Sequence, residues 1–177
     1  MSANEIVFRF PKILLVGNRG VGKSSTINEL FSPQPKLPMN KQYFDSFDVV
    51  RTFELSLAER GKLIVVNSTS FDNINSLSKT VASEILRECD IALWILKAEE
   101  DFPDMKLKFV KTMLSNKLLN SLVVAINQID LVNPGNWNLS INLPSVKQEK
   151  AIIEVEDKIQ KLFRVAEINS VKVVSYS

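Results

Sequence analysis

A glycine-rich stretch near the N-terminus limits what this 177-residue chain can fold into. The sequence GNRGVGKSS, residues 17–25, follows the apolar run KILLV and opens the helix-forming segment KSSTINELF. It matches the pattern GxxxxGK[ST], whose glycines allow backbone N–H groups to turn inward around phosphate oxygens. We therefore expect a buried strand, a tight loop and a helix, which together predict a phosphate-binding loop.

The positions of this loop have distinct expected roles. Lys23 supplies a positive charge to the β- and γ-phosphates and is the candidate catalytic residue, while Ser24 Oγ is the expected Mg²⁺ ligand. Arg19 is either solvated or able to stabilise charge in a transition state. The residues expected to contact the phosphates are Asn18, Arg19, Gly20, Val21, Gly22, Lys23, Ser24 and Ser25.

The rest of the chain alternates between apolar runs and helix-period segments. Short apolar runs occupy residues 12–17, 62–67, 91–98, 121–127 and 171–177, and residues 48–57 alternate in polarity. Helical periods occupy residues 23–31, 76–89, 103–114 and 145–163, the last after a capping-box spacing of Ser145 and Gln148. This order predicts an α/β fold with a mostly parallel sheet covered on both faces, and residues 1–177 as a single domain.

Composition excludes several kinds of chemistry. The chain has no histidine and one cysteine, so neither a Ser-His-Asp nucleophile nor a tetrahedral Cys/His zinc site can form within it. Cys89 is expected to be a buried structural thiol, and a lone cysteine fits a reducing, cytoplasmic location. No apolar run approaches the length of a membrane span, and the net charge of +2 demands no nucleic-acid partner.

A second motif follows the strand predicted at 121–127. The tetrapeptide NQID places Asn127, Gln128 and Asp130 at the carboxyl edge, where doubly wound sheets bind ligands. It resembles the base-reading [NT][KQ]xD box of GTPases, in which the aspartate carboxylate accepts from two guanine donors. The terminal VVSYS resembles the weaker SA[K] box, with Ser175 and Tyr176 in place, and a backbone N–H there would contact the base. Trp137 is expected to anchor the following loop, with a partner surface as the alternative.

With both motifs in order, the chain resembles the translation-factor (TRAFAC) class of P-loop GTPases, in the branch containing Era and septins. DIALWILKAEED and NQIDLVNPGNW look most like bacterial YfjP-like GTPases. The resemblance implies a three-layer, Ras-like G domain whose six-stranded sheet has an antiparallel second strand, and a ribosomal or other protein effector. The family's final helix is missing. We therefore expect this domain to be the N-terminal part of a longer protein, with a partner covering the open face as the alternative.

The stretch NSTS, residues 67–70, falls where this family has its DxxG box. Asn67 loses the charge that orders Mg²⁺ through water, and Ser70 loses the backbone freedom of glycine. Thr52 and Ser46 are the candidates for the second, switch-region Mg²⁺ ligand. The sequence leaves open a slow Mg²⁺-dependent GTPase acting as a molecular switch, or a module that holds guanine nucleotide without turning it over. An ATP-dependent kinase or ATPase is disfavoured by NQID.

Overall fold

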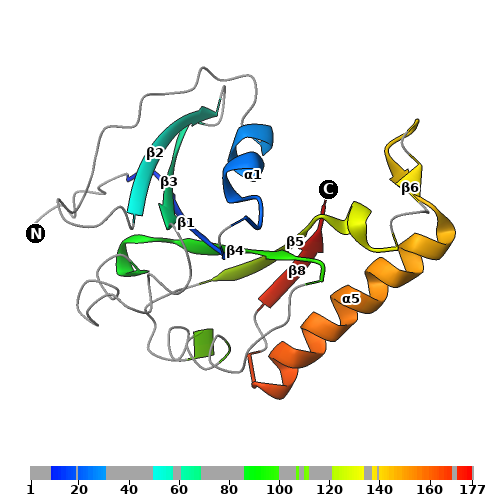
Figure 1. Cartoon of the computed structure of the whole chain (residues 1–177). Helices are drawn as coiled ribbons and strands as arrows, with labels where there is room; N and C mark the ends of the chain where they lie inside the picture. Colours follow the sequence, from blue (N-terminus) through cyan, green and yellow to red (C-terminus); the bar gives the residue numbers. More distant parts are fainter. Residues whose placement is uncertain are drawn as a thin grey trace, which may run out of the picture.

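The computed structural model describes residues 9–18, 20–30, 50–57, 61–68, 86–99, 107, 110–111, 121–133, 137–138, 140–168 and 171–176. Six strands form the main sheet in the order β2-β3-β1-β4-β5-β8 (Figure 1). They are β1 (Lys12–Val16), β2 (Val50–Leu57), β3 (Gly61–Ser68), β4 (Ile91–Lys97), β5 (Leu122–Asn127) and β8 (Val171–Ser175). The other elements are α1 (Lys23–Leu30), the 3₁₀ turn η2 (Ile129–Leu131), β6 (Trp137–Asn138), β7 (Leu143–Pro144) and α5 (Val146–Val165).

The strand directions confirm the predicted sheet. Strands β3, β1, β4, β5 and β8 run parallel to one another, and β2 is antiparallel to β3. The β2–β3 pairing runs from Val50 opposite Ser68 to Leu57 opposite Gly61, as in a hairpin. The expected turn at residues 58–60, the loop at 32–46 and most of the helices expected at 76–89 and 103–114 lie outside the described residues.

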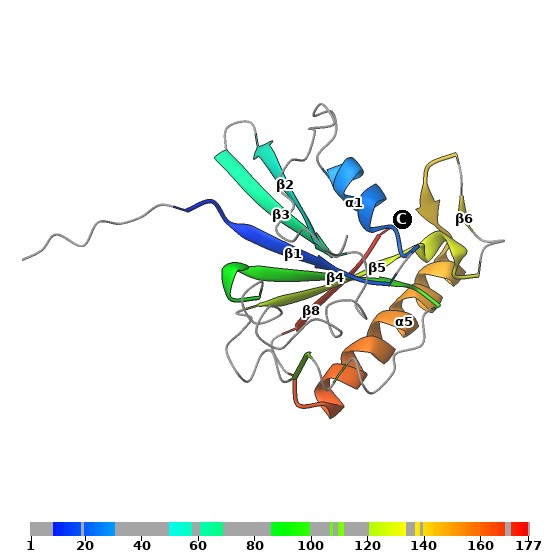
Figure 2. The ribbon, with the colours of Figure 1, turned by 60° about the vertical axis from the view of Figure 1, so that its left-hand side comes forward.

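Two clusters of buried side chains cover the two faces of the sheet. Alternate residues of each strand point to opposite faces, so Leu15 packs with Ile27 of α1, whereas Leu14 belongs to the cluster that holds α5. Trp94, expected in the core, is buried on the α5 face. Its ring packs edge to face on that of Phe163, with 6.3 Å between the ring centroids. Figure 2 shows α1 and α5 on opposite sides of the sheet, which confirms the layered arrangement.

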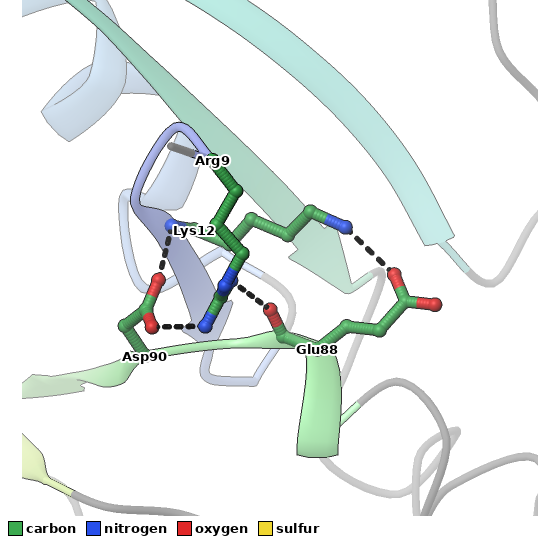
Figure 3. A network of polar contacts seen from close by, with 4 residues as sticks. All are labelled: Arg9, Lys12, Glu88 and Asp90. Carbon is green, nitrogen blue, oxygen red and sulfur yellow. Dashed lines mark hydrogen bonds and ion pairs between the residues drawn. The ribbon is translucent and has the colours of Figure 1, made fainter. Parts of the chain in front are cut away.

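A polar network ties β1 to the start of β4 at the amino edge of the sheet (Figure 3). Asp90 accepts from the Lys12 backbone N–H at 2.8 Å and pairs with Arg9, whose guanidinium also donates to the Glu88 carbonyl. Lys12 Nζ lies 2.7 Å from a Glu88 carboxylate oxygen. Cys89 lies between Glu88 and Asp90 in the sequence and is buried, as predicted. The network fixes the edge of the sheet opposite to the one where the phosphate loop emerges.

Helix α5 begins where the sequence predicted. Ser145 is its N-cap, and its hydroxyl accepts from the Gln148 backbone N–H at 3.3 Å. The helix ends at Val165, two residues beyond the predicted end, and Glu167 then turns the chain with a positive φ of 59°. Preceding α5, β6 and β7 form a small hairpin that the sequence did not predict. Trp137 packs against the core there and its indole N–H donates to Asn142, which supports its role as a loop anchor.

Candidate functional site

The two predicted motifs lie at the same edge of the sheet. The loop at 17–22 leaves the carboxyl end of β1, and the base box begins at the carboxyl end of β5. Strand β4 pairs with both β1 and β5, so one strand separates the two motifs. This is the edge at which open α/β sheets bind ligands.

Asn127 joins the base box to the phosphate loop. Its Nδ2 donates to the Val21 carbonyl at 2.9 Å, although the two residues are far apart in the sequence. Gly22 makes this contact sterically feasible: its φ is 95°, and a Cβ there would overlap the Asn127 amide. Gly17 is also confined, because a Cβ on it would lie 2.5 Å from the Ile95 carbonyl oxygen. Two of the predicted glycines are thus required by close approach as well as by their backbone angles.

Lys23 is buried at the start of α1, with 8% of its surface exposed. Its Nζ donates to the Gly17 and Asn18 carbonyls, each at 2.8 Å, so the ammonium is held across the loop. The hydroxyl-bearing residues Ser24 and Ser25 that follow are exposed. A charge held over the loop beside exposed hydroxyls at a helix N-terminus is an arrangement suited to phosphate. Arg19 lies outside the described residues.

The base box has an ordered backbone. Gln128 has the left-handed φ of 63°, and its N–H donates to Asn127 Oδ1 at 2.7 Å. The Asn127 side chain therefore bonds at both ends, once to its own box and once to the phosphate loop. The turn η2 follows, and Asp130 lies within it, half-buried. The structure brings together the asparagine and aspartate that the sequence assigned to the same box.

The backbone N–H of Tyr176 takes part in the sheet. Ser175 ends β8 opposite Ile126, and the Tyr176 N–H donates to the Ile126 carbonyl at 2.8 Å. Because that N–H completes a sheet hydrogen bond, it is not available to a base. The next backbone N–H along the chain belongs to Ser177, which lies outside the described residues.

The Tyr176 side chain instead reaches the phosphate loop. Its hydroxyl lies 2.5 Å from Thr26 Oγ1, and Thr26 in turn donates to the Gly22 carbonyl at 2.9 Å. Burial raises the pKa of the Tyr176 phenol, and the hydrogen bond to Thr26 opposes that rise. The end of β8 is therefore bonded to the first turn of α1. Figures 1 and 2 both show the C-terminal end of β8 close to α1.

The expected Mg²⁺ ligands do not all share one face of the sheet. Thr52 lies opposite Val66, whose side chain belongs to the α5-face cluster, so Thr52 is not placed beside Ser24 on α1. Asn67 is aligned with Leu15 and alternates with Val65, which puts it on the α1 face at the end of β3. Its Oδ1 is buried and has no hydrogen-bond partner in the part of the chain that the structure describes.

Ser24 and Asn67 fit a magnesium ion that is bound together with the phosphates of a nucleotide. Ser24 offers an exposed hydroxyl, and Asn67 Oδ1 is a neutral acceptor for an ion-bound water. Within the described ranges, no three acidic or cysteine side chains gather into a group that could hold a metal. The negative charge that such an ion needs would have to come from bound phosphates.

Two residues around the site were missed at the sequence level. Gln148 was assigned only to the helix cap, yet its side chain enters the base box. Thr26 was treated as an ordinary helical residue, yet it bridges Gly22 and Tyr176. A polar residue on the buried stripe of a helix is the one signal that pointed to either of them.

The chain is similar to several GTPases of known structure. Era from Aquifex aeolicus, solved with GDP·AlF4⁻, superposes with a TM-score of 0.60 at 18% identity, over 95% of this chain and 52% of Era. The G domain of the T. maritima FeoB iron transporter superposes with a TM-score of 0.56 at 15% identity, over 96% of this chain and 88% of that chain. LeoA, a bacterial dynamin GTPase from ETEC, superposes with a TM-score of 0.65 at 18% identity, over 93% of this chain and 29% of LeoA. The chain has a Ras-like G domain fold.

Curated relatives of this G domain are distant. The GTPase Der of Rippkaea orientalis is 26% identical over 137 residues, 72% of this chain and 29% of that protein. Der of Campylobacter hominis is 24% identical over 164 residues, 86% of this chain and 30% of that protein. The chain thus spans about 30% of the length of these relatives. No family model matches it. The chain is thus distantly similar in sequence to GTPase Der and similar in fold to Era.

No helix among the described residues is long and apolar enough to cross a membrane.

Proposed function

We propose that this G domain binds guanine nucleotide and hydrolyses GTP slowly with Mg²⁺, acting as a molecular switch. The observation that carries the proposal is the hydrogen bond from Asn127 Nδ2 to the Val21 carbonyl. It couples a base-reading box to a phosphate loop across one intervening strand, so one ligand with a base and a phosphate chain would engage both. A glycine-rich turn alone would have no need of that coupling.

Guanine preference is assigned to Asp130. Its carboxylate would accept from guanine N1–H and from the exocyclic amine, a pair of donors that adenine does not offer in that arrangement. With adenine bound, the carboxylate would lose those partners, which is costly for a desolvated charge. Asn127 and Gln128 would flank the base, as in the GTPases that the box resembles.

Hydrolysis would proceed by in-line attack of water on the γ-phosphorus. The bond between that phosphorus and the β–γ bridging oxygen breaks, and the proton of the attacking water passes to a phosphate oxygen. Lys23 and the N–H groups of residues 18–25 would hold the phosphates, so no side-chain base is needed from the loop. Mg²⁺, held by Ser24, would supply further positive charge to the phosphate oxygens.

A second function is favoured by one observation. Asn67 stands where the DxxG aspartate would order the Mg²⁺ water, and it provides a neutral oxygen. A module that holds nucleotide as a structural ligand or partner-binding signal, without turning it over, would keep the phosphate loop and the base box and lose only this charge. The two functions therefore differ at the γ-phosphate alone.

The wider context follows the same resemblance. Era has been solved with MgGDPNP and nucleotides 1506–1542 of 16S ribosomal RNA. By analogy we assign this domain a ribosomal or other protein effector, a place among the YfjP-like GTPases and a cytoplasmic location, as part of a longer chain. These assignments rest on family analogy, while nucleotide binding rests on the site itself.

Thermal unfolding with GDP or ADP tests the proposal. GDP at about 100 times its dissociation constant should stabilise the domain by about 2.7 kcal/mol, and ADP at the same concentration should not. Asp130→Asn should remove most of the GDP effect while leaving the unliganded melting temperature close to that of the wild type. Equal stabilisation by both nucleotides would contradict guanine specificity.

Single-turnover cleavage separates the two functions. With protein in excess over γ-labelled GTP and Mg²⁺, phosphate release that is absent in Lys23→Met identifies a slow GTPase. Firm GTP binding without release identifies the non-hydrolysing module.

A further inference from the structure

Gln148 is a fully buried polar side chain outside the predicted nucleotide-binding set. It lies in the first turn of α5 with 0% of its surface exposed. Its Nε2 donates to the Val132 carbonyl at 2.7 Å and to the Asp130 carbonyl at 3.1 Å. One side-chain amide of α5 thereby bonds two backbone carbonyls, one in the base box and one just after it.

The orientation of this amide follows from its partners. Both partners are carbonyl oxygens, which only accept, so the NH₂ group faces them and the Oε1 atom faces away. Oε1 is buried and finds no hydrogen-bond partner among the described residues. An apolar side chain of similar length would avoid that unsatisfied atom. The amide at this position is therefore explained by its two donated bonds and not by packing.

The two bonds complete the support of the Asp130 backbone. Two N–H groups are bonded within the turn, because Leu131 N donates to the Gln128 carbonyl and Val132 N to the Ile129 carbonyl, each at 3.1 Å. The carbonyls of Asp130 and Val132 accept from the Gln148 side chain. The backbone that carries the Asp130 carboxylate is thus held from inside the turn and from α5.

Helix α5 is itself a rigid support. Its N-terminus is capped by Ser145, and Ile152, Ile159 and Phe163 are buried in the core against the sheet. Gln148 therefore connects the base box to the packed core, in addition to the connection through the end of β5. A small loss of this support would move the carboxylate relative to a bound base.

We propose that Gln148 is a positioning residue that sets the guanine preference of Asp130. The inference rests on the proposed function, since it concerns the same base site. Gln148 contacts the backbone of the box, so it acts on the base through Asp130. The exocyclic amine of guanine is the group whose recognition should depend on it.

The test compares GDP with IDP, which lacks only that amine. Wild-type protein should bind GDP about ten- to a hundredfold more tightly than IDP, the range for one hydrogen bond to a charged acceptor. Gln148→Met keeps the side-chain length and removes both donors, and should lower the GDP/IDP affinity ratio about fivefold or more. Gln160→Met is the matched control on the same helix, about 18 Å further along its axis, and should leave the ratio unchanged.

A double-mutant cycle separates positioning from general destabilisation. In an Asp130→Asn background the carboxylate is gone, so Gln148→Met should no longer change the GDP/IDP ratio. An unchanged ratio in Gln148→Met itself, whatever its melting temperature, would overturn the inference. If that variant does not fold, Gln148→Asn keeps an amide with a shorter reach, and the same ratio decides. Failure of both to fold would assign Gln148 to the fold alone and overturn its specific role.

The proposed function fails in a different and visible way. If wild-type protein binds GDP no better than ADP, there is no guanine site and the role of Gln148 falls with it. If the wild type prefers GDP over both ADP and IDP and Gln148→Met leaves these preferences intact, only the inference about Gln148 is wrong.

Discussion

At the scale of single residues, the buried ionisable side chains Lys23 and Cys89 differ in what surrounds them. Lys23 is buried where two carbonyls accept from its ammonium, so burial and charge are compatible. Cys89 is buried beside the acidic residues Glu88 and Asp90 and the basic residues Arg9 and Lys12. Desolvation dominates there and raises the pKa of the Cys89 thiol to about 12, so the thiol is held neutral. Lys23 therefore keeps a positive charge that can bind phosphate, whereas Cys89 is an unreactive, neutral thiol.

The raised pKa of Cys89 makes stability depend on pH above neutrality. The unfolded thiol titrates near 9.0 and the folded thiol near 12, so the stabilisation is fully present below pH 9 and is lost as pH rises toward 12. We expect the free energy of unfolding in urea to fall more steeply between pH 8 and pH 10.5 in the wild type than in Cys89→Ala. Equal slopes would contradict a raised pKa of the Cys89 thiol in the folded protein.

Burial of Cys89 also predicts its reactivity. At pH 8, a thiol reagent should modify the folded protein slowly and the urea-unfolded protein quickly.

At the scale of elements, the end of β8 and the start of α1 are joined by side chains. The Tyr176 hydroxyl meets Thr26, which also bonds the Gly22 carbonyl, and the Tyr176 ring packs on the α1 face of the sheet. The last strand is thereby connected to the phosphate loop. This contact arises from one residue in the position where the resembling GTPases have a small one.

Removing the Tyr176 hydroxyl tests that connection. Tyr176→Phe keeps the ring and leaves Thr26 with its bond to Gly22, so we expect a loss of about 1 kcal/mol in unfolding free energy. GDP affinity should also weaken modestly, because the loop loses a support. Thr26→Val removes both bonds and should cost more in each measurement. Tyr176→Phe with wild-type stability in urea would show that the contact contributes nothing.

At the scale of the whole molecule, the two motifs are brought together by sheet order. Residues near positions 22 and 127 meet because β1 and β5 both pair with β4 and end at the same edge. The polar network of Arg9, Lys12, Glu88 and Asp90 fixes the opposite edge (Figure 3). The site is therefore a property of the assembled sheet.

Gly22 and Gly20 form a matched pair for testing this assembly. Both have positive φ, 95° and 81°, so an alanine is strained at either position. A Cβ at Gly22 would overlap the Asn127 amide, whereas a Cβ at Gly20 meets nothing within 4 Å. Gly22→Ala should therefore lose more unfolding free energy than Gly20→Ala in urea without ligand, by about 1–3 kcal/mol. Equal losses would mean that the Asn127 contact does not hold the motifs together.

The sequence by itself determined the elements whose signals are local. Continuous apolar runs predicted the buried strands to within a residue or two, since such runs are stable only when both faces are covered. The spacing of Ser145 and Gln148 predicted the start of α5, because a helix cap involves neighbouring residues only. The glycine pattern at 17–22 predicted the loop, and the backbone angles of its glycines agree.

Only the tertiary structure decided the contacts that depend on register and on distant packing. Gln148 bonds Asp130 and Val132 because α5 lies against the base box, which its own helix period does not specify. The Tyr176 N–H bonds the Ile126 carbonyl because β8 lies beside β5 in parallel, a pairing that the motif itself does not specify. Thr52 lies on the α5 face because alternate residues of a strand face opposite ways, and a shift of one residue exchanges the faces. Patterns along a chain fix what is near in sequence, while the geometry of a site depends on which distant segments the fold places side by side.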